Sequence, residues 1–238
     1  MRDFIPSKTF KNEEVLSALQ WYFESKNYHL EEALKITAPM SVESARKLRI
    51  NYSYYFISLM SALELLLDSN YPYHKEFQAD FTNGFIFNGF SNAEENYNYL
   101  RELRNCIVHR GYDIACNSRS SGSIPLLIAP ESIPNRNGNK EYLSFGICII
   151  NLIESIESVV GNLVFGHAKK VDLFKPTYTT EEQLGFILKI ISKIKFIPEQ
   201  ARKMALEEIP KIDLKNINSI QFSNFEKAIK NNVLNKPI

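Results

Sequence analysis

The longest helical pattern in the chain is the stretch SVESARKLRINYSYYFISLMSALELLLDSN, residues 41–70. Pro39 interrupts the chain just before it, and Ser41 is suited to cap its first turn. Glu43 lies within that turn, where a negative charge stabilises a helix. We therefore predict one long helix that ends near Asn70. Its many apolar residues indicate that it packs against other helices in a bundle.

Apolar residues recur at helical spacing on both sides of this stretch. Ser91 and Glu94 have the spacing of a capping box, as do Thr179 and Glu182. The first pair predicts a helix start just before NAEENYNYLRELRNCIVH, and Gly111 supplies a stop. The further predicted helices are residues 12–27, 29–36, a short one within 74–90, 141–165, 181–194 and 198–209.

These patterns predict an all-α protein, a four- to five-helix up-and-down bundle with a helical C-terminal extension. We place the bundle at residues 1–168 and the extension at 169–238. Ser, Gly, Pro and Asn are crowded around SIPLLIAP, so residues 112–139 are expected to form a short irregular or β insertion beside the helix that precedes it.

Composition excludes several classes of protein. The net charge is +1, so no global positive field favours nucleic acid, and any such contact needs a local patch. Three cysteines without CxxC spacing, and histidines without metal-like spacing, argue against a disulfide framework and a zinc site. We expect reduced thiols, no metal and no cofactor.

The sequence also predicts a location. The first residues, MRDFIPSKTFKNEE, lack the apolar stretch of a signal peptide. We find no run of about 20 apolar residues of the kind that spans a bilayer. The expectation is a cytoplasmic protein that does not enter a membrane.

One segment carries a candidate site, RNCIVH at residues 104–109. Helical spacing places Glu102, Asn105 and His109 on one stripe. A separate apolar stripe of the same helix holds Leu100, Leu103 and Ile107. The long side chain of Arg104 can swing toward the polar stripe, so a guanidinium, an amide and an imidazole could converge on one phosphate.

RNA cleavage needs groups of these kinds. A base takes the proton of the 2′-hydroxyl, an acid protonates the leaving 5′-oxygen, and a cation stabilises the charge on phosphorus. Histidine suits proton transfer near neutral pH, and arginine supplies the charge. One helix offers only His109, so a two-fold dimer that juxtaposes two such helices would supply both proton-transfer groups.

The segment RNCIVH resembles the R-(polar)-x-x-x-H signature of HEPN domains, over roughly residues 12–165. The resemblance implies a helical bundle with the signature on a late helix, and homodimers that pair two signatures across a cleft. It also implies metal-independent RNA cleavage in toxin–antitoxin, phage-defence or CRISPR-linked settings. Some toxins of the family place a tyrosine two residues beyond the histidine, where this chain has Gly111 followed by Tyr112.

We therefore expect a homodimeric endoribonuclease with His109 as general acid and base, Arg104 on the scissile phosphate and Asn105 orienting one of them. The partners would be the RNA substrate and an antitoxin or another defence-system component. The alternative is a non-catalytic helical module that binds RNA, a nucleotide or a protein. In a purely structural interpretation, Arg104 and Asn105 are a solvated helix face and His109 stabilises the helix end.

Two carboxylates are supporting candidates. Glu64 lies inside the apolar run FISLMSALELLL, where it would hold Arg104 or line the cleft, or else be an exposed helical residue. Glu102 shares the polar stripe and could orient His109, or pair with Arg101 or another base.

Overall fold

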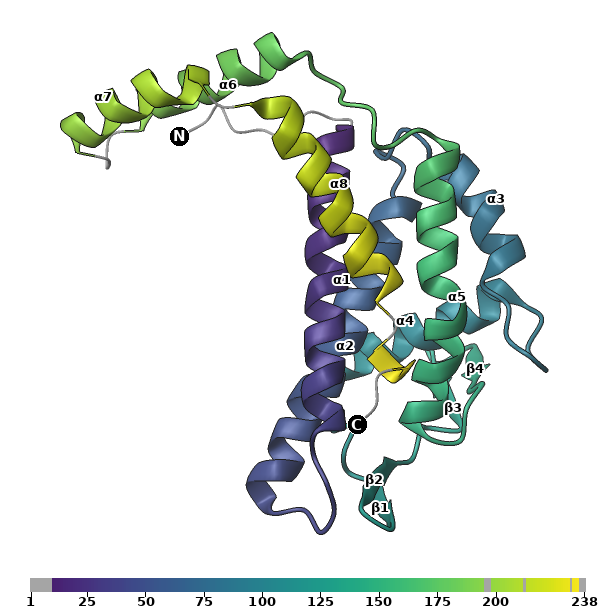
Figure 1. The fold of residues 1–238 in the computed structure, drawn as a ribbon. Helices are drawn as coiled ribbons and strands as arrows, with labels where there is room; N and C mark the ends of the chain where they lie inside the picture. Colours follow the sequence, from purple (N-terminus) through teal and green to yellow (C-terminus); the bar gives the residue numbers. More distant parts are fainter. Residues whose placement is uncertain (1–9, 195–197, 212, 232, 236–238) are drawn as a thin grey trace.

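The computed structural model describes residues 10–194, 198–211, 213–231 and 233–235, and within them it is mainly α-helical (Figure 1). The predicted α-rich class is confirmed, with two small antiparallel sheets in addition. The helices are α1 (Asn12–Leu34), α2 (Val42–Leu67), α3 (His74–Gly84), α4 (Ala93–His109), α5 (Ile149–Lys170), α6 (Thr180–Lys193), α7 (Glu199–Glu208) and α8 (Leu214–Lys230). The strands are β1 (Ser118–Ser121), β2 (Ile124–Leu127), β3 (Ser132–Pro134) and β4 (Glu141–Leu143), and η1 (Ile209–Lys211) and η2 (Val233–Asn235) are short 3-10 helices.

The long helix α2 pairs with α1 in an antiparallel hairpin. The hydroxyls of Ser25 and Ser58 lie 2.9 Å apart, and the His29 Nδ1 lies 3.0 Å from the side-chain oxygen of Asn51. As residue numbers rise along α1 they fall along α2, so the two helices run in opposite directions. The predicted cap of α2 is confirmed, because the backbone N–H of Ser44 donates to the Ser41 hydroxyl at 3.0 Å.

Helix α1 corrects the prediction of two helices over residues 12–36. It is one helix from Asn12 to Leu34. No proline or glycine separates the two predicted pieces, so nothing breaks the ladder of backbone hydrogen bonds. Leu30 and Ala33 continue the buried stripe that begins at Val15, and tertiary packing thus joins the pieces.

A buried ion pair ties α1 to α5. The Lys26 ammonium donates to both carboxylate oxygens of Glu157 at 2.7 and 2.8 Å. The hydroxyl of Tyr55 on α2 donates to the same carboxylate at 2.6 Å. Burial lowers the pKa of Lys26 although the Glu157 carboxylate acts to raise it. Three helices therefore meet at one polar cluster inside an otherwise apolar core.

Helix α5 begins later than the predicted helix over 141–165. It starts at Ile149 because residues 141–143 pair with 132–134 as strand β4. By length and mean hydropathy alone α5 could cross a membrane, which the sequence analysis did not anticipate. Nine of its side chains, including Leu152, Ile153 and Ile156, are buried by the rest of the chain.

The insertion between α4 and α5 forms two small hairpins. Ser118 pairs opposite Leu127 in the first, and Ser132 opposite Leu143 in the second. The irregular segment thus runs beyond the predicted limit of residue 139 to the start of α5. The second hairpin packs on α4, where the Tyr99 hydroxyl donates to the carbonyl of Pro130 at 2.7 Å.

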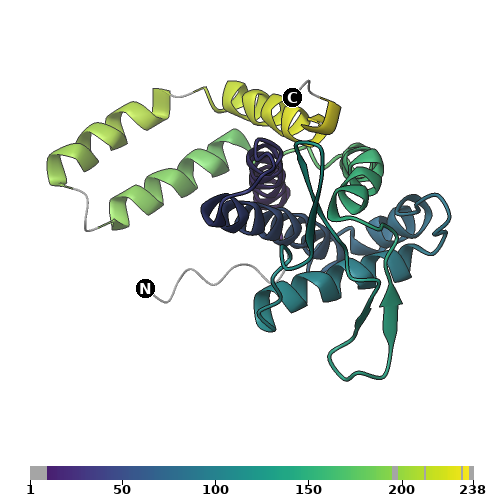
Figure 2. The ribbon, with the colours of Figure 1, turned by 90° about the horizontal axis from the view of Figure 1, so that it is seen from below.

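The C-terminal extension divides into two parts. Helix α5 continues to Lys170, past the boundary that we predicted at 168. Helix α8 then returns to pack on α1 and α5, with Phe225 and Ile229 buried. Helices α6 and α7 project from the rest as a two-helix arm (Figures 1 and 2). The extension is therefore partly core and partly arm, because among its described helical residues from α6 onward only those of α8 include fully buried side chains.

Candidate functional site

The helix that carries RNCIVH is bounded at both ends by specific residues. Its N-cap is Asn92, whose side-chain oxygen accepts the backbone N–H of Glu95 at 3.1 Å, so the predicted capping box at Ser91 is wrong by one residue. Its last residue is His109, and Gly111 follows with φ +67°, a conformation that glycine adopts without strain. The predicted glycine stop is therefore confirmed.

The two faces of α4 differ as helical spacing predicts. Leu100 and Leu103 are fully buried against the core. Arg104 and Asn105 are half-buried, and His109 is exposed at the helix end. Arg104 and His109 are five residues apart, which separates them by about 140° around the helix axis. One copy of α4 therefore presents them on different sides.

Arg104 faces α2. Its Nη2 donates to the carboxylate of Glu64, and the two side chains form an ion pair. The Arg104 Nε is buried and has no hydrogen-bond partner within the described residues. Burial raises the pKa of neighbouring Tyr97 to about 12, and the Glu64 carboxylate acts in the same direction. The guanidinium is thus paired with a carboxylate through Nη2.

Glu102 supplies the carboxylate of the α4 polar stripe, and its side chain is only 6% exposed. It accepts from Arg110 at 3.3 Å and, at the limit of a hydrogen bond, from the Asn105 amide at 3.5 Å. Arg101 lies 3.7 Å away. Of the two alternatives for Glu102, pairing with Arg101 or another base is the one observed, whereas a contact with His109 is not among those of the described residues.

The side chain of His109 has no hydrogen bond or ion pair within the described part of the chain. Tyr112, the nearest tyrosine along the chain, is half-buried, and burial raises its pKa to about 12. A hydroxyl with so high a pKa is a poor proton-transfer partner at neutral pH. Within a single chain, Arg104 lies against Glu64 and Asn105 lies against Glu102, whereas the His109 side chain has no partner among the described residues.

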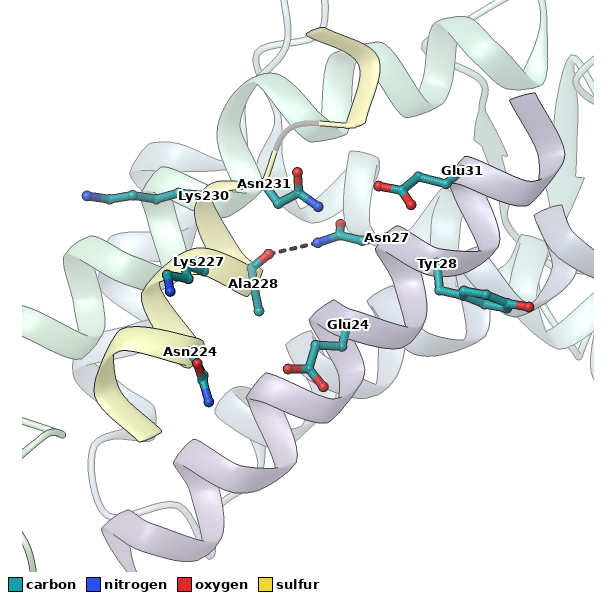
Figure 3. Close-up of a pocket in the computed structure, with 9 residues that line it drawn as sticks. All are labelled: Glu24, Asn27, Tyr28, Glu31, Asn224, Lys227, Ala228, Lys230 and Asn231. Carbon is teal, nitrogen blue, oxygen red and sulfur yellow. Dashed lines mark hydrogen bonds between the residues drawn. The ribbon is translucent and has the colours of Figure 1, made fainter. Parts of the chain in front are cut away.

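A hollow of about 630 Å³ lies elsewhere, between α1 and α8 (Figure 3). Its walls carry carboxylates from α1, such as Glu24, and ammonium groups from α8, such as Lys227. The Asn27 amide crosses it to donate to the Ala228 carbonyl at 2.8 Å. Its lining includes no residue of RNCIVH, and its mixed charges favour no one ligand class.

A buried histidine network was missed by the sequence analysis. His167 Nδ1 lies 2.9 Å from a carboxylate oxygen of Asp80, and its Nε2 lies 3.0 Å from the hydroxyl of Tyr71. Lys170 donates to the other Asp80 oxygen at 2.6 Å. Tyr71 and His167 are almost completely buried, so the network joins α3 to α5. Spacing could not reveal it, because its members are far apart in the sequence.

Comparisons with protein-family models, with curated proteins and with solved structures give no match to this chain.

Proposed function

We propose that this protein is a metal-independent endoribonuclease of HEPN type that acts as a homodimer. The proposal extends the helical fold to a four- to five-helix up-and-down bundle with RNCIVH on a late helix. The observation that carries it is the arrangement on α4. Arg104 is paired with Glu64, Asn105 lies beside Glu102, and the imidazole of His109 is exposed at the same helix end.

In the proposed reaction His109 takes the proton of a ribose 2′-hydroxyl. The 2′-oxygen forms a bond to phosphorus while the bond from phosphorus to the 5′-oxygen breaks. The second copy's imidazole protonates the leaving 5′-oxygen, and Arg104 balances the charge on the phosphoryl oxygens. The products are a 2′,3′-cyclic phosphate and a free 5′-hydroxyl.

The geometry of α4 supports a dimeric site. Because about 140° of helix rotation separates Arg104 from His109, a phosphate between two antiparallel copies meets them more readily than one on a single helix. Two copies also supply the base and the acid together. The His109 side chain has no partner among the described residues of its own chain. In the dimer it would lie beside residues of the second copy.

The alternative is a non-catalytic helical module that binds RNA, a nucleotide or a protein through the same face. One observation favours it, namely that Glu64 already neutralises Arg104. An arginine in such a pair binds a phosphate less strongly than an unpaired one, because the phosphate competes with a carboxylate. Binding without turnover would therefore support this module.

A toxin–antitoxin or anti-phage setting in the cytoplasm follows from the same proposal. The resemblance implies that setting, and in it the partner would be an antitoxin or another defence-system component. Poor growth on expression, relieved by His109→Ala, would support a toxin. Equal growth with both proteins would contradict it.

The test is cleavage of total RNA in EDTA by wild type and by His109→Ala, with product ends identified. His74→Ala, on α3, controls for the loss of an imidazole elsewhere. We expect wild type and His74→Ala to leave cyclic phosphate ends and His109→Ala to lose at least about a hundredfold in rate. His109→Ala protein that cuts as fast as wild type would refute the proposal. If all three proteins bind RNA and none cleaves it, the binding module is favoured.

A further inference from the structure

The arm formed by α6 and α7 buries none of its side chains. Neither helix has a buried residue, although α6 begins with a complete capping box and is well formed. Figures 1 and 2 show the two helices side by side and pointing away from the body. Helix stability in water comes mainly from packing an apolar face, so a helical pair this exposed lacks a covering surface.

The apolar residues of α6 form a continuous stripe. Leu184, Ile187, Leu188 and Ile191 are spaced by three and four residues, and all are only half-buried. Helix α7 packs beside α6, and Ile187 lines a hollow that α1 also borders. Phe186 on α6 is 58% exposed and Met204 on α7 is 60% exposed. A two-helix hairpin leaves both sides of its apolar contact open, and a second hairpin closes it as a four-helix arrangement.

The charges of α6 are divided between its two ends. Glu181 and Glu182 lie in the first turn, and Lys189 and Lys193 lie in the second half. When two copies of α6 run antiparallel, the acidic end of each meets the basic half of the other. Such a pairing is self-complementary under a two-fold axis, as an interface between identical chains requires.

We propose that the arm binds the arm of a second copy of this chain, through the apolar stripe of α6 and with α6 antiparallel to its counterpart. Two acidic and two basic residues cancel along the helix, so a strongly acidic partner such as nucleic acid gains little there. The surface is separate from RNCIVH, and the proposal does not depend on whether Arg104 and His109 cleave RNA.

Two charge variants of the full chain test this pairing. The acidic-arm variant is Lys189→Glu with Lys193→Glu, and the basic-arm variant is Glu181→Lys. Glu182 is kept in both, because its carboxylate accepts the backbone N–H of Thr179 at 2.8 Å in the capping box. In the acidic-arm variant carboxylates meet carboxylates, and in the basic-arm variant the new ammonium at position 181 meets the lysines of the second half. A mixture of the two gives position 181 of each chain an opposite charge, although Glu182 of the basic-arm chain then faces the new carboxylates.

The measurement is the dissociation constant for self-association, obtained by sedimentation over a dilution series. We expect each variant alone to associate at least about tenfold more weakly than wild type, and an equal mixture to associate measurably more tightly than either variant alone. Lys47→Glu with Lys75→Glu places the charge change of the acidic-arm variant on the body instead and serves as its control. Far-UV circular dichroism controls for helix content in every variant. Monomeric wild type, unchanged association of both variants, or a mixture that does not recover would overturn the proposal. His109→Ala is expected to leave association through the arm unchanged, which separates this result from the ribonuclease test.

Discussion

Replacement of Lys26 by methionine should lower the free energy of unfolding by about 3–5 kcal/mol at pH 7. The side chains of Lys26 and Glu157 are only 2% and 4% exposed. Methionine fills a similar volume but leaves the Glu157 carboxylate buried with the Tyr55 hydroxyl as its remaining donor. Because single domains unfold at about 5–15 kcal/mol, the loss is a large part of the total.

The assay is urea unfolding followed by far-UV circular dichroism. Lys35→Met is the matched control, since the pair of Lys35 with Glu32 lies at the surface, where an ion pair contributes little to stability. Addition of Glu157→Gln to Lys26→Met removes the stranded charge and keeps an acceptor for Tyr55, so most of the loss should be recovered. If Lys26→Met costs no more than Lys35→Met, the buried pair does not hold α1 on α5 as we argue.

Three further perturbations test other parts of the fold. Burial lowers the pKa of His167, with a hydrogen bond to a carboxylate opposing it, so the unfolded chain takes up the extra proton as pH falls below about 6.5. Stability, measured by urea unfolding at each pH, should therefore fall from pH 7 to pH 5. A His167→Gln protein whose stability falls equally over that pH range would contradict this. A methyl group at Gly161 would lie 2.7 Å from a backbone oxygen of α8, so Gly161→Ala should cost about 1–3 kcal/mol in thermal unfolding, whereas Gly166→Ala, with nothing within 4 Å, should not destabilise. Asn92→Ala should cost about 1 kcal/mol and Ser91→Ala much less, and the reverse order would restore Ser91 as the cap of α4.

Local signals predicted several elements correctly. Ser41 caps α2 and Thr179 caps α6, where a short polar side chain precedes a helical run. Gly111 ends α4, since the positive φ that it adopts suits glycine. These features depend on residues close together in the chain, so spacing and residue type suffice to predict them.

Other elements depended on contacts between distant residues. The segment EYL continues the apolar pattern of α5, yet it is strand β4 because residues 132–134 pair with it. Helices α6, α7 and α8 have similar amphipathic patterns, but only α8 packs on the body. An amphipathic pattern shows that a face must be covered and does not show by what.

The same division applies to the candidate site. The sequence by itself determined that Arg104, Asn105 and His109 lie at the end of a helix, because periodicity and a glycine stop are local. The sequence named Glu64, forty residues earlier, as a candidate partner of Arg104, and only the tertiary structure selected that alternative over an exposed glutamate. The tertiary structure also decided that Glu102 lies beside Arg110 and Asn105. Ion pairs of this kind depend on how helices pack side by side, and helix packing is a property of the whole chain.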